Sequence, residues 1–284
     1  MIDSLSFDAY TPTWCPGCGD WSIRIGIKTA LTQLGYDPSK VFITFDIGCS
    51  GNMNDFLSGY AMHTLHGRAV PSAIGMKIGN HNVKTIVIGG DGGIYGEGGN
   101  HFLHACRGNH DVTVIVHDNM VYGLTTGQVA PTAKKGYKSK STPLGIIEVP
   151  LNPLALAVSQ GATFVAQAFA GDLNNVIDTV KKGLQHRGFS LINLLQPCVT
   201  FNKINTYQYY LKHVYKLPGE YDKSNLKEAM NKALEVNEEK FPLGVLYQAE
   251  KPTFHEQLPQ LVGNMPLVDR TRYTAFDPLI NEFI

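Results

Sequence analysis

The stretch Val83-Lys-Thr-Ile-Val-Ile-Gly-Gly-Asp-Gly-Gly93 decides the fold, because an apolar, β-branched run ends there directly in a glycine-rich turn. Runs of this kind are typical of strands buried on both faces, as the strands of parallel sheets are. Further runs of this kind lie at 41–45, 112–117, 164–165 and 189–195, and helical patterns lie at 20–34, 96–106 and 173–184. The alternation predicts an α/β fold with a doubly wound, mostly parallel sheet.

The composition is that of a chain that can bury a sizeable core. Of its 284 residues 43% are hydrophobic and 17% are charged, and 24 basic residues balance 24 acidic ones. Because binding to nucleic-acid phosphates needs a basic excess, we expect no nucleic-acid partner. The apolar runs are too short to cross a bilayer and residues 1–10 lack the apolar part of a signal peptide, so we expect no membrane association. Five cysteines without a regular framework are typical of a reducing compartment, and we expect a cytoplasmic protein.

Two regions depart from the alternation of strands and helices. Residues 127–145 hold four lysines among Pro, Gly, Ser and Thr, which predicts a long surface loop. Beyond residue 200 the composition becomes polar and aromatic, with one helical pattern around 225–237. We therefore predict a binding module over 1–200 and a C-terminal extension over 201–284, packed on the module or on a partner chain.

Polar and thiol side chains follow four of the predicted strands. Cys49 follows the first run, Asp91 the second, Asn119 the third and Cys198 the last. In open parallel sheets, ligands bind beyond the carboxyl ends of the strands. The four positions therefore predict one site at one edge of the sheet.

The oxygen-bearing residues of this edge suit a magnesium ion that holds a diphosphate. Such an ion prefers carboxylate, amide and carbonyl oxygens, which Asp91, Asn119 and the Val121 carbonyl can supply. The glycines of 89–93 let the backbone approach a phosphate closely. A Gly-Asp-Gly sequence alone is more often an ordinary turn, and the dinucleotide fingerprint G-x-G-x-x-G is not matched in this stretch, which argues against a nicotinamide cofactor.

Four of the cysteines suit a soft metal centre. Cys15 and Cys18 come from one glycine-containing loop, and Cys49 and Cys198 complete four thiolates, enough for a 4Fe–4S cluster. A structural zinc site with the same ligands, or a redox pair of Cys15 and Cys18, remains open at this point. The fifth cysteine, Cys106, is expected to be a small buried residue.

Taken together, these motifs resemble the β subunit of 2-oxoacid:ferredoxin oxidoreductases, which are thiamine-diphosphate enzymes that make acyl-CoA. The similarity spans roughly residues 10–200 and continues weakly through PLGVLYQ (242–248). The segments that carry it are WCPGCGD (14–20), IGCSGN (47–52), HTLHGRAVP (63–71), GGDGGIYGEGGNHFLHACRGN (89–109), VTVIVHDNMVYGLTTGQVAPT (112–132) and LQPCVTF (195–201).

The resemblance implies a role for each matching position. The cluster would be held by Cys15, Cys18, Cys49 and Cys198, and Mg²⁺ by Asp91, Asn119 and Val121. The thiamine cofactor would also be lined by Ile47, Gly48, Cys49, His66, Gly90, Gly92, Gly93, Tyr122, Gly123, Leu124 and Thr125. His66 and Leu124 would lie at the thiazolium as the catalytic positions of this chain. For His63 and His104 we retain the structural interpretation.

The resemblance also implies an activity and partners. A 2-oxoacid would be oxidatively decarboxylated with coenzyme A, giving acyl-CoA and CO₂, and electrons would pass through the 4Fe–4S cluster to ferredoxin. The reaction could run in reverse with a strong reductant. The glutamate that activates the cofactor is expected on a partner chain, an α subunit or an α/γ fusion, so we expect this chain to be inactive alone.

Two positions depart from the pattern of many relatives. Gly93 stands where many have a second aspartate. Asn52 stands where several have a basic residue that can pair with a substrate carboxylate. Because asparagine carries no charge, a second carboxylate on the substrate is disfavoured, and we expect a monocarboxylic 2-oxoacid.

Two other functions remain to be weighed. One is a zinc-stabilised, thiamine-dependent decarboxylase subunit without electron transfer. The other is a non-catalytic subunit that keeps the fold for assembly. Each leaves one of the two ligand sets, the thiols or the oxygens, without a purpose.

Overall fold

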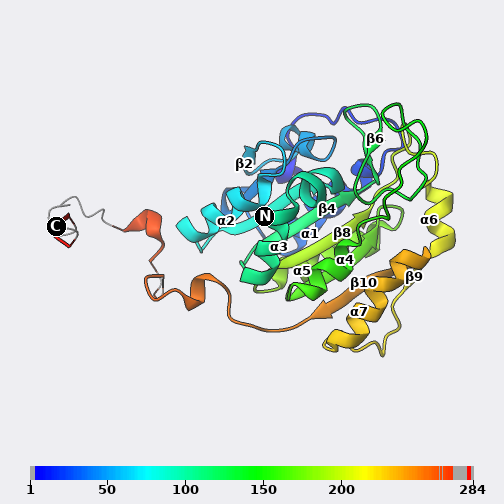
Figure 1. Ribbon diagram of the computed structural model, residues 1–284. Helices are drawn as coiled ribbons and strands as arrows, with labels where there is room; N and C mark the ends of the chain where they lie inside the picture. The colour runs from blue at the N-terminus through cyan, green and yellow to red at the C-terminus, as the bar shows by residue number, and fades with distance from the viewer. Residues whose placement is uncertain (1–3, 262, 264, 271–279, 283–284) are drawn as a thin grey trace.

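The computed structural model describes residues 4–261, 263, 265–270 and 280–282. Its centre is an eight-stranded sheet (Figure 1). From one edge to the other the strands are β2 (Tyr60–His63), β1 (Val41–Phe45), β3 (Lys84–Gly90), β4 (Thr113–Asp118), β8 (Ser190–Leu195), β7 (Phe164–Phe169), β10 (Phe241–Gln248) and β9 (Val214–Lys216). Neighbouring strands run parallel except for β7 and β10, which are antiparallel.

Helices cover both faces of the sheet. Alternate residues of its central strands point to opposite faces, so both faces carry apolar side chains on which helices can pack. Ile88 and Ile115 pack into the core with α1 (Gly19–Gln33) and α5 (Leu173–Gln185). Val87 and Val114 pack into a second core on the other face. Its helices are α2 (Ala69–Gly79), α3 (Gly99–Gly108), α4 (Pro153–Ser159) and α7 (Leu226–Leu234). The predicted doubly wound α/β fold is confirmed.

The remaining elements are short. A π-helix (Gly92–Glu97) precedes α3, α6 is Tyr207–His213, and β5 (Val121–Tyr122) pairs with β6 (Gln128–Val129). The 3₁₀ turns are Ser4–Phe7, Pro38–Lys40, Gly51–Asp55, Glu235–Glu238, His255–Gln257 and Leu267–Asp269. In Figure 1 the green loops around β6 and the yellow helix α6 lie at the same end of the molecule. Within the described ranges, no helix combines the length and the apolar character that crossing a membrane requires.

Most predicted elements are present, with four differences in their extent. The run at 164–165 is the start of the longer strand β7, and the helix expected over 96–106 is a π-helical turn followed by α3. The predicted loop over 127–145 contains β6 at its start. The helix expected around 225–237 is α7 with the 3₁₀ turn after it.

The C-terminal extension takes part in the sheet. β10 pairs with β7 and β9 pairs with β10, and α7 covers one face. The division at residue 200 stays a prediction, and the part of the extension at 271–279 and 283–284 lies outside the described residues.

Candidate functional site

The four strands that precede the predicted ligands are neighbours in the sheet. β1, β3, β4 and β8 lie side by side in that order and run parallel, so their carboxyl ends meet at one edge. Cys49, Asp91, Asn119 and Cys198 follow these four strands. The topology therefore brings together residues that are up to half the chain apart in sequence.

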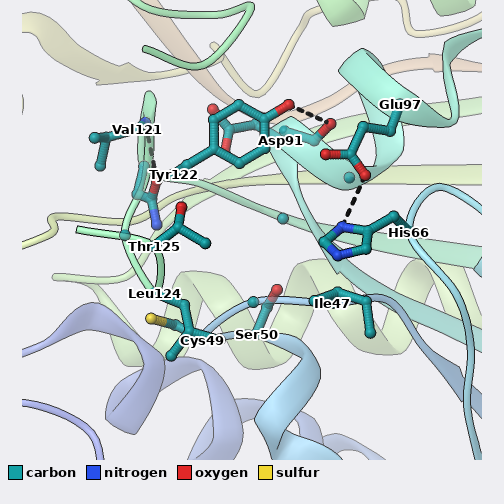
Figure 2. A pocket seen from close by; sticks show the side chains of 16 residues that line it. Ile47, Cys49, Ser50, His66, Asp91, Glu97, Val121, Tyr122, Leu124 and Thr125 are labelled. Carbon is teal, nitrogen blue, oxygen red and sulfur yellow. Dashed lines mark hydrogen bonds and ion pairs between the residues drawn. The ribbon is translucent and has the colours of Figure 1, made fainter. Parts of the chain in front are cut away.

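A first pocket at this edge, with a volume of about 50 Å³, is drawn in Figure 2. Its wall includes every residue that we expected at the thiamine cofactor. These are Ile47, Gly48, Cys49, His66, Gly90, Asp91, Gly92, Gly93, Asn119, Val121, Tyr122, Gly123, Leu124 and Thr125. Ser50 and Glu97, which the sequence did not indicate, complete the wall. The gathering of these residues is a finding, whereas their individual roles stay predictions.

The residue between two predicted magnesium ligands has an unusual backbone. Met120 has φ of 60°, in the left-handed region that non-glycine residues seldom adopt. Within this turn the Val121 amide donates to Asn119 Oδ1 over 3.0 Å. Asn119 Oδ1 keeps a second lone pair that can bind a cation. Sparsely populated backbone conformations of this kind collect at binding sites, where the surrounding structure holds them.

Asp91, in the wall of the pocket, is buried together with a second carboxylate, that of Asp118. The Thr132 hydroxyl contacts Asp91 Oδ2 and lies 3.0 Å from Asp118 Oδ1. Burial, followed by the nearby Asp118 charge, raises the pKa of Asp91 well above its usual value, and burial also raises the pKa of Asp118. A buried carboxylate is costly unless a cation or a proton neutralises it. The site therefore fits a divalent cation that takes oxygen ligands, such as Mg²⁺.

The glycines of the turn are required by close packing. A side chain at Gly92 would overlap the Tyr122 ring, and a Cβ at Gly93 would lie 2.7 Å from Asp46 Oδ1. That Asp46 oxygen accepts hydrogen bonds from the amides of Ile47 and Gly67, at 2.7 and 3.2 Å. A side chain at position 93 would therefore require the Asp46 carboxylate to move.

His66 is paired with a residue of the π-helix. Its Nδ1 lies 2.9 Å from Glu97 Oε2, and Figure 2 shows the two side chains turned toward each other at the pocket. The His66 side chain is 60% exposed, and Leu124 on the opposite wall is 47% exposed. The pocket is therefore open on the side where these two residues lie.

A second cavity of about 230 Å³ is lined by all four predicted cluster ligands, Cys15, Cys18, Cys49 and Cys198. Their sulfurs and backbones are held by neighbours. Thr200 Oγ1 donates to Cys15 Sγ and Gln196 Nε2 donates to Cys18 Sγ, both over 3.1 Å. Trp14 Nε1 donates to the Cys49 carbonyl over 2.8 Å. Hydrogen bonds to sulfur are among the contacts that tune iron–sulfur clusters.

All four cysteines line the second cavity, and two of their sulfurs lie close to Gly123. A Cβ placed on Gly123 would lie 3.6 Å from the sulfurs of both Cys49 and Cys198, so these two flank the glycine. Among the described residues, no group of three or more His, Cys, Asp or Glu side chains is arranged to hold a single ion. A tetrahedral zinc needs four sulfurs at about 2.3 Å from one centre, whereas a cluster of several atoms occupies the space between them. The assignment of a 4Fe–4S cluster to these four cysteines stays a prediction.

Two of the four thiols, one of them the Cys18 member of the candidate redox pair, are poorly suited to nucleophilic chemistry. Burial, followed by the Asp20 charge, raises the pKa of the Cys18 thiol well above its usual value. Burial likewise raises the pKa of Cys49 to about 12. Such thiols are poor nucleophiles at neutral pH and ionise only when a metal replaces the proton. Cys106 is fully buried on α3, as the sequence suggested.

Comparison with known proteins identifies the family. The model of the thiamine pyrophosphate enzyme C-terminal TPP-binding domain matches residues 46–194, and that of the C-terminal part of the pyruvate ferredoxin oxidoreductase β subunit matches 198–262. The β subunit of a 2-oxoacid:ferredoxin oxidoreductase from Saccharolobus solfataricus is 43% identical over 275 residues, which cover 90% of each chain. The chain belongs to the β subunits of 2-oxoacid:ferredoxin oxidoreductases.

Two further relatives agree with this assignment. A 2-oxoglutarate synthase subunit KorB from Methanocaldococcus jannaschii is 34% identical, covering 89% of this chain and 93% of the relative. The structure of the 2-oxoglutarate:ferredoxin oxidoreductase from Magnetococcus marinus was solved with 2-oxoglutarate, coenzyme A and succinyl-CoA bound. It superposes on this β subunit with a TM-score of 0.91 at 36% identity, covering 99% of this chain and 96% of that one. The thiamine-diphosphate-binding fold and membership in a multi-subunit oxidoreductase follow.

Several residues of this β subunit that support the ligands were not predicted from its sequence. The Thr132 hydroxyl contacts both Asp91 and Asp118. Glu97 pairs with His66, and Gln196 donates to the Cys18 sulfur. Each acts on a residue far away in sequence. Only the nearness of Asp118 to Asn119 and of Gln196 to Cys198 could have drawn attention to them.

Asn52, the residue on which the substrate expectation rests, does not line the first pocket. It lines the second cavity, which is called the cysteine cavity from here on. The two cavities nevertheless share walls, formed by Cys49, Asn119, Gly123 and Leu124. Asn52 therefore lies one wall away from the pocket that would hold the thiamine cofactor.

Proposed function

We propose that this β subunit holds thiamine diphosphate through Mg²⁺ in the first pocket and a 4Fe–4S cluster in the cysteine cavity. In this proposal the enzyme oxidatively decarboxylates a 2-oxoacid with coenzyme A and passes the electrons to ferredoxin. The observation that carries it is the wall shared by the two cavities. Gly123, in that wall, has no side chain to separate the oxygen ligands from the sulfurs of Cys49 and Cys198.

The residues of the first pocket have distinct tasks in the proposal. Asp91, Asn119 and the Val121 carbonyl would hold the metal, and the glycine-rich turn gives the diphosphate access to backbone amides. Bound there, thiamine diphosphate supplies an electron sink for the decarboxylation. Leu124 and Ile47 would keep water from the reacting atoms. The His66 imidazole, oriented by Glu97 at 2.9 Å, can hold or release a proton at the pocket.

The open side of the pocket supports the need for a partner. His66 and Leu124 are half-exposed although the proposed chemistry has to exclude water. An α subunit, or an α/γ fusion, would cover this side and bring the activating glutamate. The five cysteines are free thiols, which supports a reducing, cytoplasmic location.

An anaerobic absorption spectrum of the complex with its partner subunit tests the proposal, with iron and zinc counted on the same sample. We expect a broad band near about 400 nm, typical of iron bound to thiolates, that bleaches when a 2-oxoacid and coenzyme A are added. A colourless protein that carries zinc would favour the thiamine-dependent decarboxylase without electron transfer. Loss of thiamine binding would favour the non-catalytic assembly subunit.

A further inference from the structure

The protein as a whole is electrically balanced, but the segments around the cysteine cavity are not. Residues 9–19, 47–54, 119–147 and 195–219 contain no aspartate or glutamate and hold seven lysines. Asp20, which follows the first segment, is fully buried and lies 2.5 Å from His117 Nδ1. The exposed residues Asp55, Glu148 and Glu220 directly follow three of these segments, so the excess of basic charge belongs to the segments themselves.

The predicted loop over 127–145, which holds four lysines, contacts the cysteine cavity. Its two arms pair through the Gly136 amide to the Ile146 carbonyl at 2.8 Å and the Ile146 amide to the Tyr137 carbonyl at 3.0 Å. The Tyr137 hydroxyl donates to the carbonyl of Phe201, a cavity residue, over 2.9 Å, and Tyr137 packs in one cluster with Cys198. Lys138, next to Tyr137, and Lys140 are exposed on this loop.

A third lysine comes from the segment after Cys198. Lys203 is exposed, and its ammonium group donates to the carbonyl of Val199, which lines the cavity. Cys15, whose sulfur accepts from Thr200, is the exposed member of the four cysteines. The three lysines Lys138, Lys140 and Lys203 are called the lysine rim below.

Two of the other four lysines of the same region form ion pairs. Lys134 pairs with Glu239, and Lys216 pairs with Asp172 at 3.0 Å. In the part of the chain that the structure describes, no ion pair is formed by the lysine rim. Lys134 and Lys135 line a separate cavity of about 460 Å³, whereas the lysine rim lines neither that cavity nor the cysteine cavity. Its three residues are exposed and lie outside both cavities, which suits contact with a protein surface better than enclosure of a small phosphate.

We propose that the lysine rim is the docking surface for a small acidic electron-carrier protein. The inference rests on the proposed function, because it requires that electrons leave through the cysteine cavity. Unpaired charges of one sign attract a partner of opposite sign over about a Debye length, about 8 Å at physiological salt, and orient it during the encounter. Leu144, 94% exposed on the returning arm of the loop, offers an apolar contact beside these charges.

The test uses the complex of this chain with its partner subunit and a purified, oxidised, acidic ferredoxin. Binding is measured by titration at low salt and at about 150 mM salt. For the variant Lys138→Glu/Lys140→Glu/Lys203→Glu we expect an affinity for ferredoxin at least about tenfold lower. The affinity of the unaltered complex should decrease as salt is added, whereas that of the variant should not. Ferredoxin reduction should fall further than reduction of methyl viologen, a small acceptor that needs no docking surface.

The matched control changes three exposed lysines outside the lysine rim, one before α7, one within it and one after β10. In Figure 1 α7 lies at the bottom of the molecule and the loops around β6 lie at the top. Lys223→Glu/Lys227→Glu/Lys251→Glu alters the net charge equally and should bind ferredoxin as the unaltered complex does. If both variants lost the same affinity for ferredoxin, or if neither lost any, the docking surface would be overturned. Continued reduction of methyl viologen would in that case still support the proposed function. A complex without iron would overturn both proposals.

Discussion

At the scale of single residues, Thr132 controls the environment of the proposed metal ligand. Its hydroxyl carries one proton but contacts both Asp91 and Asp118, so a further proton or a cation is needed at these carboxylates. Mg²⁺ at Asp91 would be such a cation.

Replacing Thr132 by valine should therefore weaken Mg²⁺-dependent binding of thiamine diphosphate by about ten-fold or more, the usual effect of losing a hydrogen bond to a metal ligand. Calorimetry on the assembled enzyme measures the binding of thiamine diphosphate at increasing Mg²⁺ concentrations. Thr132→Ser keeps the hydroxyl and should bind as before. Equal affinities of the valine and serine variants would show that Thr132 only fills space.

Asn52 carries the prediction about the substrate. A neutral amide offers no charge to a second carboxylate, so turnover should be clearly higher with pyruvate or a branched 2-oxoacid than with 2-oxoglutarate. Asn52→Lys should raise kcat/KM for 2-oxoglutarate by about ten-fold, the value of one hydrogen bond to a charged group. Asn54→Lys, two residues further along, is the control. Comparable turnover of all three acids by the unaltered enzyme would refute the monocarboxylic preference.

At the scale of elements, the segment 249–258 forms a strap across the sheet end opposite to the site. The Ala249 amide donates to the Thr163 carbonyl over 2.8 Å, and the Phe254 amide donates to the Asn109 carbonyl over 3.1 Å. The Phe254 ring lies 4.2 Å from the His110 ring. The strap is thus held by residues that precede strands β4 and β7.

Acid should loosen this strap. Burial lowers the pKa of His110 and of His186 to about 4, and His186 Nε2 lies 2.8 Å from Thr163 Oγ1. Because their pKa in the folded state lies below the unfolded value of about 6.5, their contribution to stability is complete above pH 6.5 and is lost as the pH falls toward 4. Hydrogen exchange at the Ala249 and Phe254 amides, corrected for intrinsic rates, should therefore accelerate between pH 7 and 5.

A matched variant separates this effect from general acid unfolding. His110→Asn removes one titrating group and should reduce the dependence of strap exchange on pH. The amides of strand β4, in the middle of the sheet, serve as an internal control and should stay protected. Unchanged protection of the strap at pH 5 would contradict the role given to the two histidines.

How far the elements could be predicted depends on how they are buried. β1, β3, β4 and β8 are buried on both faces and read as apolar runs. β2 is exposed at every position and has no such run. β10 contains Pro242 and Gly244, which disfavour a strand by sequence, and is formed because it can pair with β7.

The same reasoning separates the predictable part of the site from the rest. Residues at strand ends, such as Asp91 and Cys198, could be placed because parallel strands end at a common edge. Glu97 and Thr132 could not, because their roles depend on His66 and Asp91, which the chain brings to them only through tertiary packing.

At the scale of the whole molecule, the open pocket predicts that this chain cannot work alone. The purified β subunit should bind iron through its own four cysteines but show no turnover of a 2-oxoacid with coenzyme A. Addition of the α subunit should restore turnover, because it covers His66 and Leu124 and excludes water. Viologen reduction by each subunit and by the mixture is the measurement. Full activity of the single chain would contradict the prediction.

The antiparallel strand β10 has a consequence for biosynthesis. On the ribosome, β7 (Phe164–Phe169) emerges long before Phe241, the first residue of β10. During that interval β7 is an open edge, with amides and carbonyls that can pair with another nascent chain. Translation that stalls before β10 should therefore leave an aggregating fragment, although all four cysteines and both carboxylates of the site have already been made.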